Sequence, residues 1–483
     1  MTIARRRICA ALLAAMLALA AAPAAPGATA PARAASWLTP IGAETHELDL
    51  LNDQRAAVGE APVIMDPRIE AIAEARSMDM ATRHYFSHTQ PDGRTAFSML
   101  DASGVSWSRA GEIIAWNAGF GDYAGSADEA ASQWHDSAPH YAIITTAAYT
   151  AAGVGVAYDS SSGRTYWTAI FIQGPPPPPP PPPPSDPDRV AGTDRYATAA
   201  MTSAEAFAPG VTVAYVATGE AYPDALAGAA AAAADDAPVL LVRDDLVPMA
   251  TAYELDRLQP GRIVLLGGTG SVDTAVMSLL DGYTQGGVTR LAGSDRYATA
   301  AAISRATFTA GVPLVYVATG LDFADALAGS AAAAHLGAPI LLVGTAVPSA
   351  TATELARLRP GRIVVLGGSG AVSEAVRGAL VRYATSGRVD RVWGVDRYAT
   401  AVALSRSVYG GASTLYLATG ANFPDALAGA PLGGPLLLVP GNSAPQSVLD
   451  EAQRLGPSRV VVLGGSATIS DAVVDAVRGA AGL

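Results

Sequence analysis

Three polar side chains, His88, Glu112 and His140, are of the types that bind divalent metal ions or transfer protons. Two imidazoles and a carboxylate can hold Zn²⁺ and leave one coordination position open. The same groups can act as general acid and general base on a bound substrate. They are 24 and 28 residues apart, so their spacing alone does not show that they come together in the fold. Three interpretations stay open: metal or ligand binding, a hydrogen-bonded polar cluster without turnover, and catalysis.

Other chemistries are excluded by motifs that the chain lacks. His84 and His88 have the spacing of a metal-binding helix pair, but Tyr85 stands where a His-Glu-x-x-His metallopeptidase motif has its glutamate. We therefore expect His84 to be a solvated residue at a helix end. The sequence has no Gly-x-Ser-x-Gly motif of a serine hydrolase. Its single cysteine, Cys9, excludes a disulfide framework and a cysteine-based metal site.

A second set of candidate residues occurs three times. A block containing Gly-x-Asp-Arg-Tyr-Ala-Thr-Ala begins at Arg189, Arg290 and Arg391. The arginines of the three Asp-Arg pairs are Arg195, Arg296 and Arg397. Such an arginine can bind phosphate or carboxylate groups of a polymer with a two-pronged hydrogen bond. Alternatively, the aspartate and the arginine pair with each other or with a helix start at a contact between repeats, which is the interpretation we favour.

The elements around these pairs follow an α/β pattern. Short apolar runs typical of buried parallel strands alternate with alanine-rich helical stretches. In the first repeat the predicted strands are 213–217, 239–242 and 263–266, and the predicted helices are 224–234, 249–258 and 272–281. A glycine-rich segment follows the last strand of each repeat, at 267–270, 367–370 and 464–467. These segments are expected to be tight turns, with anion binding through backbone N–H groups as the alternative.

The region 42–173 has a different pattern. Apolar residues at helical spacing predict helices over 44–59 and 67–86. Alternating residues predict two strands, 154–159 and 166–172, joined by a serine-rich turn. Helices followed by a closing hairpin indicate an α+β domain.

Composition sets the context in which these domains work. Three arginines and an apolar stretch at the start predict a signal peptide over 1–35, and hence an exported chain. Ten consecutive prolines, Pro175 to Pro184, predict a semi-rigid polyproline linker over 174–185. The formal net charge of −12, with no lysine, argues against nucleic acid as a partner. No transmembrane helix is expected in the mature chain.

The thrice-repeated blocks resemble the type-2 cell-wall-binding repeats (CWB2) of Gram-positive surface proteins. The resemblance covers repeat 1 (186–285), repeat 2 (286–386) and repeat 3 (387–483). It implies three tandem Rossmann-like α/β units in a pseudo-threefold arrangement. It also implies non-covalent binding to an anionic cell-wall polysaccharide or teichoic-type polymer.

The region 42–173 resembles the bacterial CAP superfamily (SCP/PR-1-like), through segments that include Phe86-Ser-His, Gly111-Glu-Ile-Ile-Ala-Trp and Trp134-x2-Ser-x2-His. The resemblance implies an α-β-α sandwich. It also implies a cleft lined by His88, Glu112, Ser137 and His140, and a divalent metal such as Zn²⁺ as a candidate cofactor of His88, Glu112 and His140.

We therefore expect a secreted protein of the cell wall or cell surface, in which three repeats anchor a CAP domain to an anionic wall polymer. Two alternatives stay open for the cleft: a metal-dependent hydrolase of wall or peptide substrates, and a binder of small apolar ligands such as lipids. Enzymatic activity is undecided, and the sequence favours binding over turnover.

Overall fold

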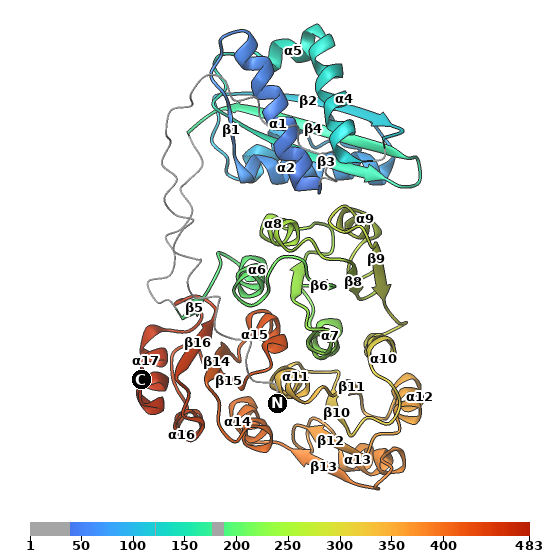
Figure 1. Cartoon of the computed structure of the whole chain (residues 1–483), viewed down its shortest axis with the longest axis vertical. Coiled ribbons are helices and arrows are strands. Elements are labelled where there is room, and N and C mark those ends of the chain that lie inside the picture. Colours follow the sequence, from blue (N-terminus) through green and yellow to red (C-terminus); the bar gives the residue numbers. More distant parts are fainter. Residues whose placement is uncertain (1–38, 121, 176–187) are drawn as a thin grey trace. The chain divides into compact units, whose positions relative to one another are not determined.

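The computed structural model describes residues 39–120, 122–175 and 188–483 (Figure 1). The predicted signal peptide and most of the predicted polyproline linker lie outside these residues. Among the helices that are described, none combines the length and the apolar character needed to cross a bilayer.

Residues 39–175 form one four-stranded sheet between two helical layers. The strand order is β1 (Ile64–Met65), β3 (Ala151–Asp159), β4 (Arg164–Gln173), β2 (Arg109–Ala118). β1 pairs parallel with β3, and the other neighbours are antiparallel. The helices are α1 (Pro40–Ala57), α2 (Pro67–Arg83), α3 (Ala96–Ala102), α4 (Tyr123–Asp136) and α5 (Ala138–Ile144). The predicted α-β-α sandwich is confirmed.

Each face of this sheet has its own apolar core. One core joins α1 and α4 to the sheet through residues such as Leu51 and Trp134, both fully buried. The other joins α2 and α3 to the opposite face through Ile69 and Leu100. A Cβ added to Gly153 would lie 2.2 Å from the backbone nitrogen of Glu70 on α2. Glycine in β3 therefore lets α2 lie directly on the sheet.

Predicted and observed elements differ mainly at their ends. α2 starts at the predicted Pro67, after the N-cap Asp66, but ends at Arg83 because His84 turns left-handed with a φ of 55°. β3 and β4 both extend beyond the predicted strands. β2 was not predicted, since its buried residues form a nearly continuous run without the alternation that marks a strand.

Residues 188–483 form three parallel four-stranded sheets. The first has the order β7 (Val239–Val242), β6 (Ala214–Thr218), β8 (Ile263–Leu266), β9 (Val288–Leu291). The second has the order β11 (Ile340–Val343), β10 (Leu314–Thr319), β12 (Arg362–Leu366), β13 (Val389–Val392). The third has the order β15 (Leu436–Val439), β14 (Thr414–Thr419), β16 (Arg459–Leu463), β5 (Arg189–Val190).

Helices cover both faces of every sheet. Those of the first unit are α6 (Arg195–Ala206), α7 (Pro223–Ala234), α8 (Met249–Leu258) and α9 (Thr274–Asp281). Those of the second are α10 (Arg296–Thr307), α11 (Ala324–Leu336), α12 (Ser349–Leu358), α13 (Glu374–Leu380) and the 3₁₀ helix Val381–Tyr383. Those of the third are α14 (Arg397–Val408), α15 (Pro424–Gly429), the 3₁₀ helix Ala430–Leu432, α16 (Gln446–Leu455) and α17 (Asp471–Ala481).

The boundaries of the sequence repeats and of the folded units differ by one strand, because the first strand of each repeat belongs to the sheet of another repeat. The strand that opens repeat 2 completes the first sheet, and the strand that opens repeat 3 completes the second. β5, which opens repeat 1, pairs with β16 of repeat 3 through Arg189 opposite Val462. The beginning of the repeat region is therefore built into its last sheet, and the three units close into a ring.

The ring has a common centre. α7, α11 and α15 face one another there, and their alanines share one apolar core (Figure 1). The rings of Tyr222, Phe323 and Phe423 meet in the same place, with centroids 5.6–6.1 Å apart. Small side chains let the helices approach closely, and three equivalent aromatics fill the axis. The predicted pseudo-threefold arrangement is confirmed.

Candidate functional site

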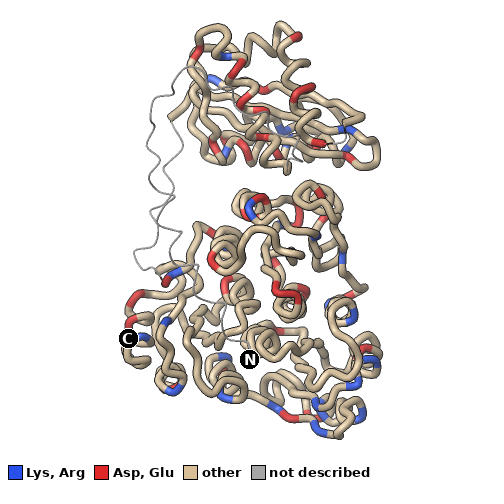
Figure 2. Tube along the Cα trace, in the orientation of Figure 1, with Lys and Arg blue, Asp and Glu red and all other residues tan. Residues whose placement is uncertain are grey.

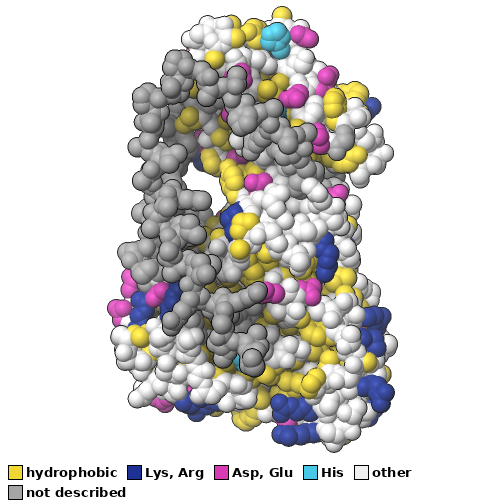
Figure 3. Space-filling view, viewed as in Figure 1, with side chains coloured by type: hydrophobic (Ala, Val, Ile, Leu, Met, Phe, Trp, Pro, Cys, Tyr) yellow, Lys and Arg dark blue, Asp and Glu magenta, His cyan; other side chains and the backbone are white. Residues whose placement is uncertain are grey.

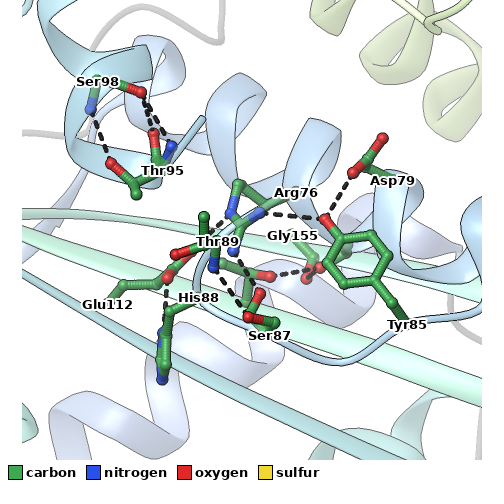
Figure 4. A network of polar contacts seen from close by, with 12 residues as sticks. Arg76, Asp79, Tyr85, Ser87, His88, Thr89, Thr95, Ser98, Glu112 and Gly155 are labelled. Carbon is green, nitrogen blue, oxygen red and sulfur yellow. Dashed lines mark hydrogen bonds and ion pairs between the residues drawn. The ribbon is translucent and has the colours of Figure 1, made fainter. Parts of the chain in front are cut away.

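The centre of the CAP-like cleft is the carboxylate of Glu112. β2 carries this residue on the face that α2 covers, where Arg76 of α2 reaches it. The Nε of Arg76 donates to Oε1 of Glu112 at 2.8 Å, and both side chains are almost fully buried. Arg76 also donates to the Ser87 carbonyl and to the Tyr85 hydroxyl (Figure 4). One arginine thus fixes both Glu112 and the loop that carries His88.

His88 is oriented by the other oxygen of Glu112. Its Nδ1 lies 2.7 Å from Oε2, while the imidazole is half exposed (Figure 4). An ionised carboxylate accepts hydrogen bonds only, so Nδ1 carries the proton and donates. In the neutral ring, Nε2 then keeps its lone pair. The arrangement therefore presents an oriented basic nitrogen in the cleft.

Arg76 was not predicted as a site residue, although its position in the sequence indicates a buried charge. The residue lies four positions after Ile72 and four before Met80, on the apolar face of the predicted helix. A lone arginine on such a face needs an anionic partner, because an isolated buried charge is costly. Arg76 therefore predicts a buried acidic partner, which the structure identifies as Glu112.

Ser137 and His140 lie where α4 passes into α5. Ser137 ends α4 and precedes α5, and its side chain makes no capping bond. His140 lies in the first turn of α5. Burial, and then the charge of His88, lower the pKa of His140. The two imidazoles are therefore near enough to interact, and His140 is neutral at neutral pH.

The cleft has two hollows with different linings. One, of about 470 Å³, is lined by residues that include His88, Glu112 and Tyr149. The other, of about 660 Å³, is lined by Ser137, His140 and exposed aromatic rings such as Trp116. The structure thus brings His88 and Glu112 into direct contact and places Ser137 and His140 in the neighbouring hollow.

The three-ligand metal site predicted from the sequence does not fit this arrangement. Both oxygens of Glu112 are engaged, by Arg76 and by His88. Over 39–120, 122–175 and 188–483, no group of three or more His, Cys, Asp or Glu side chains could hold a metal ion. Binding by His88, Glu112 and His140 would require Glu112 to leave its partners, so the ligand role of these residues stays a prediction.

In the repeats, the aspartate and the arginine of each Asp-Arg pair have separate partners. Asp194, Asp295 and Asp396 are the N-caps of α6, α10 and α14, and each accepts from the backbone N–H three residues on at 2.8 Å. The arginines donate from Nη1 to the glycine carbonyl that ends the central strand, as Arg397 does to Gly420 at 2.6 Å. The pairs therefore stabilise helix starts and strand ends in all three copies.

The same arginines also lie at the contacts between units. Arg397 stacks over Phe323 of the preceding unit, with its guanidinium carbon 5.3 Å from the ring centroid. Arg296 stands in the same way over Tyr222. The predicted role at a repeat–repeat contact is therefore confirmed for these two. Their role in polymer binding stays a prediction.

The glycine-rich segments pack against aspartates that are half-buried in the first two units and buried in the third. Gly267, Gly367 and Gly464 have positive φ, and a Cβ on each would meet a carboxylate oxygen of Asp224, Asp325 or Asp425. Burial raises the pKa of all three aspartates, that of Asp425 to about 6. A neighbouring carboxylate opposes anion binding, so these segments are the expected tight turns.

Comparison with known proteins agrees with this division of the chain. The family model "Cell wall binding domain 2 (CWB2)" matches residues 189–277, 290–377 and 391–474, and "Cysteine-rich secretory protein family" (CAP) matches 48–171. The amidase LytC of Bacillus subtilis is 28% identical over 295 residues, which are 60% of this chain and 58% of that amidase. The uncharacterized protein YkwD of the same organism is 30% identical over 129 residues, 27% of this chain and 46% of YkwD.

A solved structure shows the same repeat architecture. Cwp8 from Clostridium difficile superposes with a TM-score of 0.57 at 26% identity, covering 61% of this chain and 52% of Cwp8. This chain thus matches about half the length of these relatives, and the likeness to LytC and Cwp8 extends over more than half of its own length.

Proposed function

The chain belongs to the cell wall binding domain 2 family and carries a CAP domain ahead of three repeats, as a cell-wall-associated surface protein; from this premise we propose that the repeats hold the CAP domain non-covalently on an anionic polymer of the wall. The amidase activity belongs to LytC, and this chain matches only 58% of that protein, so no amidase activity is proposed for this chain.

The observation that carries the proposal is the uneven charge of the repeats. Repeat 1 has five arginines against fourteen acidic residues, whereas repeat 2 has eight arginines against five. Figure 2 shows arginines gathered on the outer helices of the second unit, and Figure 3 shows basic side chains on its surface. Arg359 and Arg382 are among those exposed there. An anionic polymer is thus attracted locally, despite the acidic chain.

Three linked units strengthen weak contacts. The three units share one apolar core and are closed by the β5–β16 pairing, so binding at one unit raises the effective polymer concentration at the others. Arg195 and Arg296 are exposed and use Nη1 for a backbone carbonyl. A guanidinium has five N–H donors. The remaining donors of these arginines, and of the half-buried Arg397, are available to polymer groups.

The test is co-sedimentation of the full secreted chain with Gram-positive cell walls. One sample keeps its anionic polymers, and a matched sample has been stripped of them. We expect retention on native walls, with affinity falling as salt is raised, and loss of retention on stripped walls. Equal retention on both samples would contradict the polymer proposal.

A second candidate function, hydrolysis of a wall or peptide substrate in the CAP cleft, is favoured by one observation. The Glu112 carboxylate orients His88 so that Nε2 is available as a base beside a hollow. Turnover of peptidoglycan or casein that is lost in His88→Ala supports this function. An intact, folded chain that turns over neither substrate, with or without added Zn²⁺, argues against it.

A further inference from the structure

The three contacts between units share the residues of the Asp-Arg pair but differ in the residues that precede it. Repeat 3 has Trp393 and Val395 where repeat 1 has Ala191 and Thr193, and repeat 2 has Ala292 and Ser294. Trp393 is 54% exposed and Val395 is 90% exposed. Large apolar groups in water are costly, so their presence at only one of three equivalent positions needs a reason outside the fold.

Both side chains border a groove between the second and third units. The groove has a volume of about 560 Å³ and is also lined by Leu321, which is 64% exposed. Sites for small ligands have roughly 300–1,000 Å³. At the position of Leu321, repeat 1 has Glu220 and repeat 3 has Ala421. This one groove thus has large exposed apolar side chains where the other copies have alanine or polar residues.

The tryptophan lies beside the glycine-rich turn that follows β12, the neighbouring strand of the second sheet. A Cβ added to Gly368 would lie 3.6 Å from Cε3 of Trp393, so one edge of the indole is next to this turn. A side chain with a neighbour on one side has less conformational freedom to lose when it binds a ligand. The rest of the indole is exposed and offers a flat apolar surface.

The polar lining favours hydroxyl groups over anions. The groove contains the carboxyl groups of Asp322, Asp325 and Asp396 against one guanidinium, that of Arg397. Arg397 already donates to the Gly420 carbonyl. Asp322 and Asp396 each use only Oδ1 for a backbone N–H. Their second oxygens can accept from hydroxyl donors, whereas a phosphate would be repelled.

We propose that this groove, lined by Leu321, Trp393, Val395, Asp322 and Asp396, binds a neutral pyranose unit of the wall glycan, stacked on Trp393. A pyranose has one face of C–H groups, which the electron-rich face of an indole attracts, and a rim of hydroxyls for the aspartates. The inference rests on the proposed anchoring function and deepens it. The arginines of repeat 2 attract the anionic polymer, and the groove recognises its sugar.

The first experiment compares variants of the full secreted chain on native walls. Trp393→Ala removes the indole, whereas Val381→Ala trims an exposed apolar residue outside the groove. We expect affinity about tenfold weaker for Trp393→Ala and unchanged for Val381→Ala, with unchanged thermal unfolding in both. If Trp393→Ala binds native walls as the unaltered chain does, the groove proposal is wrong.

The second experiment separates sugar from phosphate. Trp393 is the one tryptophan in 188–483, so the fluorescence difference between the chain and Trp393→Phe reports on the groove. The probes are wall polymer, its saccharide units freed of phosphate with hydrofluoric acid, and glycerol phosphate. We expect the polymer and the saccharides to change the signal. A response to glycerol phosphate alone, or to none of the probes, would overturn the proposal.

The two proposals can fail separately. Equal retention on native and stripped walls contradicts anchoring by polymer, whatever Trp393 does. Retention that needs the polymer but is unaffected by Trp393→Ala leaves the anchor in place and removes the sugar groove.

Discussion

The CAP cleft and the contacts between repeats use the same types of side chain in opposite ways. In the cleft, the buried Arg76 and Glu112 and the half-exposed His88 form one chain of polar contacts, which is not repeated elsewhere in the CAP domain or the repeats that the structure describes. In the repeats, each aspartate cap, arginine–carbonyl bond and interface aspartate is present three times. A feature that appears in every copy serves the fold, whereas one that appears in a single copy is a candidate for function.

By this criterion Trp393 and the His88–Glu112 pair are the functional candidates, and the capping aspartates and the arginine–carbonyl bonds of the three Asp-Arg pairs are framework.

The largest effect is expected at the unique ion pair of the CAP domain. Glu112→Ala leaves the guanidinium of Arg76 buried without a counter-charge and removes the partner of His88. Breaking a buried pair in this way costs about 3–5 kcal/mol. Denaturant unfolding followed by the signal of the CAP domain measures the loss.

The control for this prediction removes both charges. Arg76→Met with Glu112→Leu leaves no buried charge, so much of the stability should return. If Glu112→Ala costs less than 1 kcal/mol, the pair is not a structural element of the cleft.

The next effect concerns the glycine between β13 and α14, which lies close to the first turn of α14. A Cβ on Gly394 would lie 2.4 Å from the carbonyl carbon of Ala399, and Gly192 and Gly293 are equally crowded. Gly394→Ala should therefore destabilise the repeats by about 2–3 kcal/mol. Gly370→Ala is the matched control, because nothing lies within 4 Å of its added Cβ. Equal thermal stability of the two variants would contradict the packing.

A pH effect follows from the interface aspartate of the third unit. Burial raises the pKa of Asp425 to about 6, although Arg195 opposes the shift. The folded state thus binds the proton more tightly than the unfolded state. The resulting stability is present below about pH 4 and is lost as pH rises through about 6.

The variant Asp425→Asn tests this effect. It should gain about 1–2 kcal/mol at pH 7 relative to the unaltered chain and flatten the dependence of stability on pH. The exposed Asp475→Asn should change neither. Identical pH profiles for the unaltered chain and Asp425→Asn would contradict a shifted pKa at this contact.

The smallest effect is expected at the helix caps. Asp194→Ala, Asp295→Ala and Asp396→Ala each remove one capping bond of 2.8 Å. Each should cost about 1 kcal/mol. Because the cap is a framework feature, the three costs should be similar in thermal unfolding. Asp396 also lines the groove beside Trp393, so only Asp396→Ala should lose more wall affinity than its loss of stability explains. The same loss in Asp194→Ala or Asp295→Ala would move that aspartate to the functional side.

Regular patterns made most of the fold predictable from the sequence. Strands 239–242 and 263–266 and helix 249–258 match the observed elements at both ends, because apolar runs and proline boundaries define them locally. The pairing of β5 with β16 could not be inferred, since it joins residues at opposite ends of the repeat region. Local pattern carries no information about such a closure.

The sites were harder to predict than the fold. Resemblance named His88, Glu112 and His140, but contact between Arg76 and Glu112 depends on how α2 crosses the sheet. The exposure of Trp393 could not be predicted from the sequence either, because an apolar residue at a strand end is usually buried. Only the packing of the second unit against the third shows that it lines a groove.

Retention of the exported chain on the cells that produce it tests the central claim most directly. The intact chain is compared with a variant that ends before residue 188 and so keeps the CAP domain without the repeats. Tethering by the repeats predicts that the intact chain fractionates with the wall and the shortened chain appears in the medium. A shortened chain that stays on the cells as firmly as the intact one would contradict it.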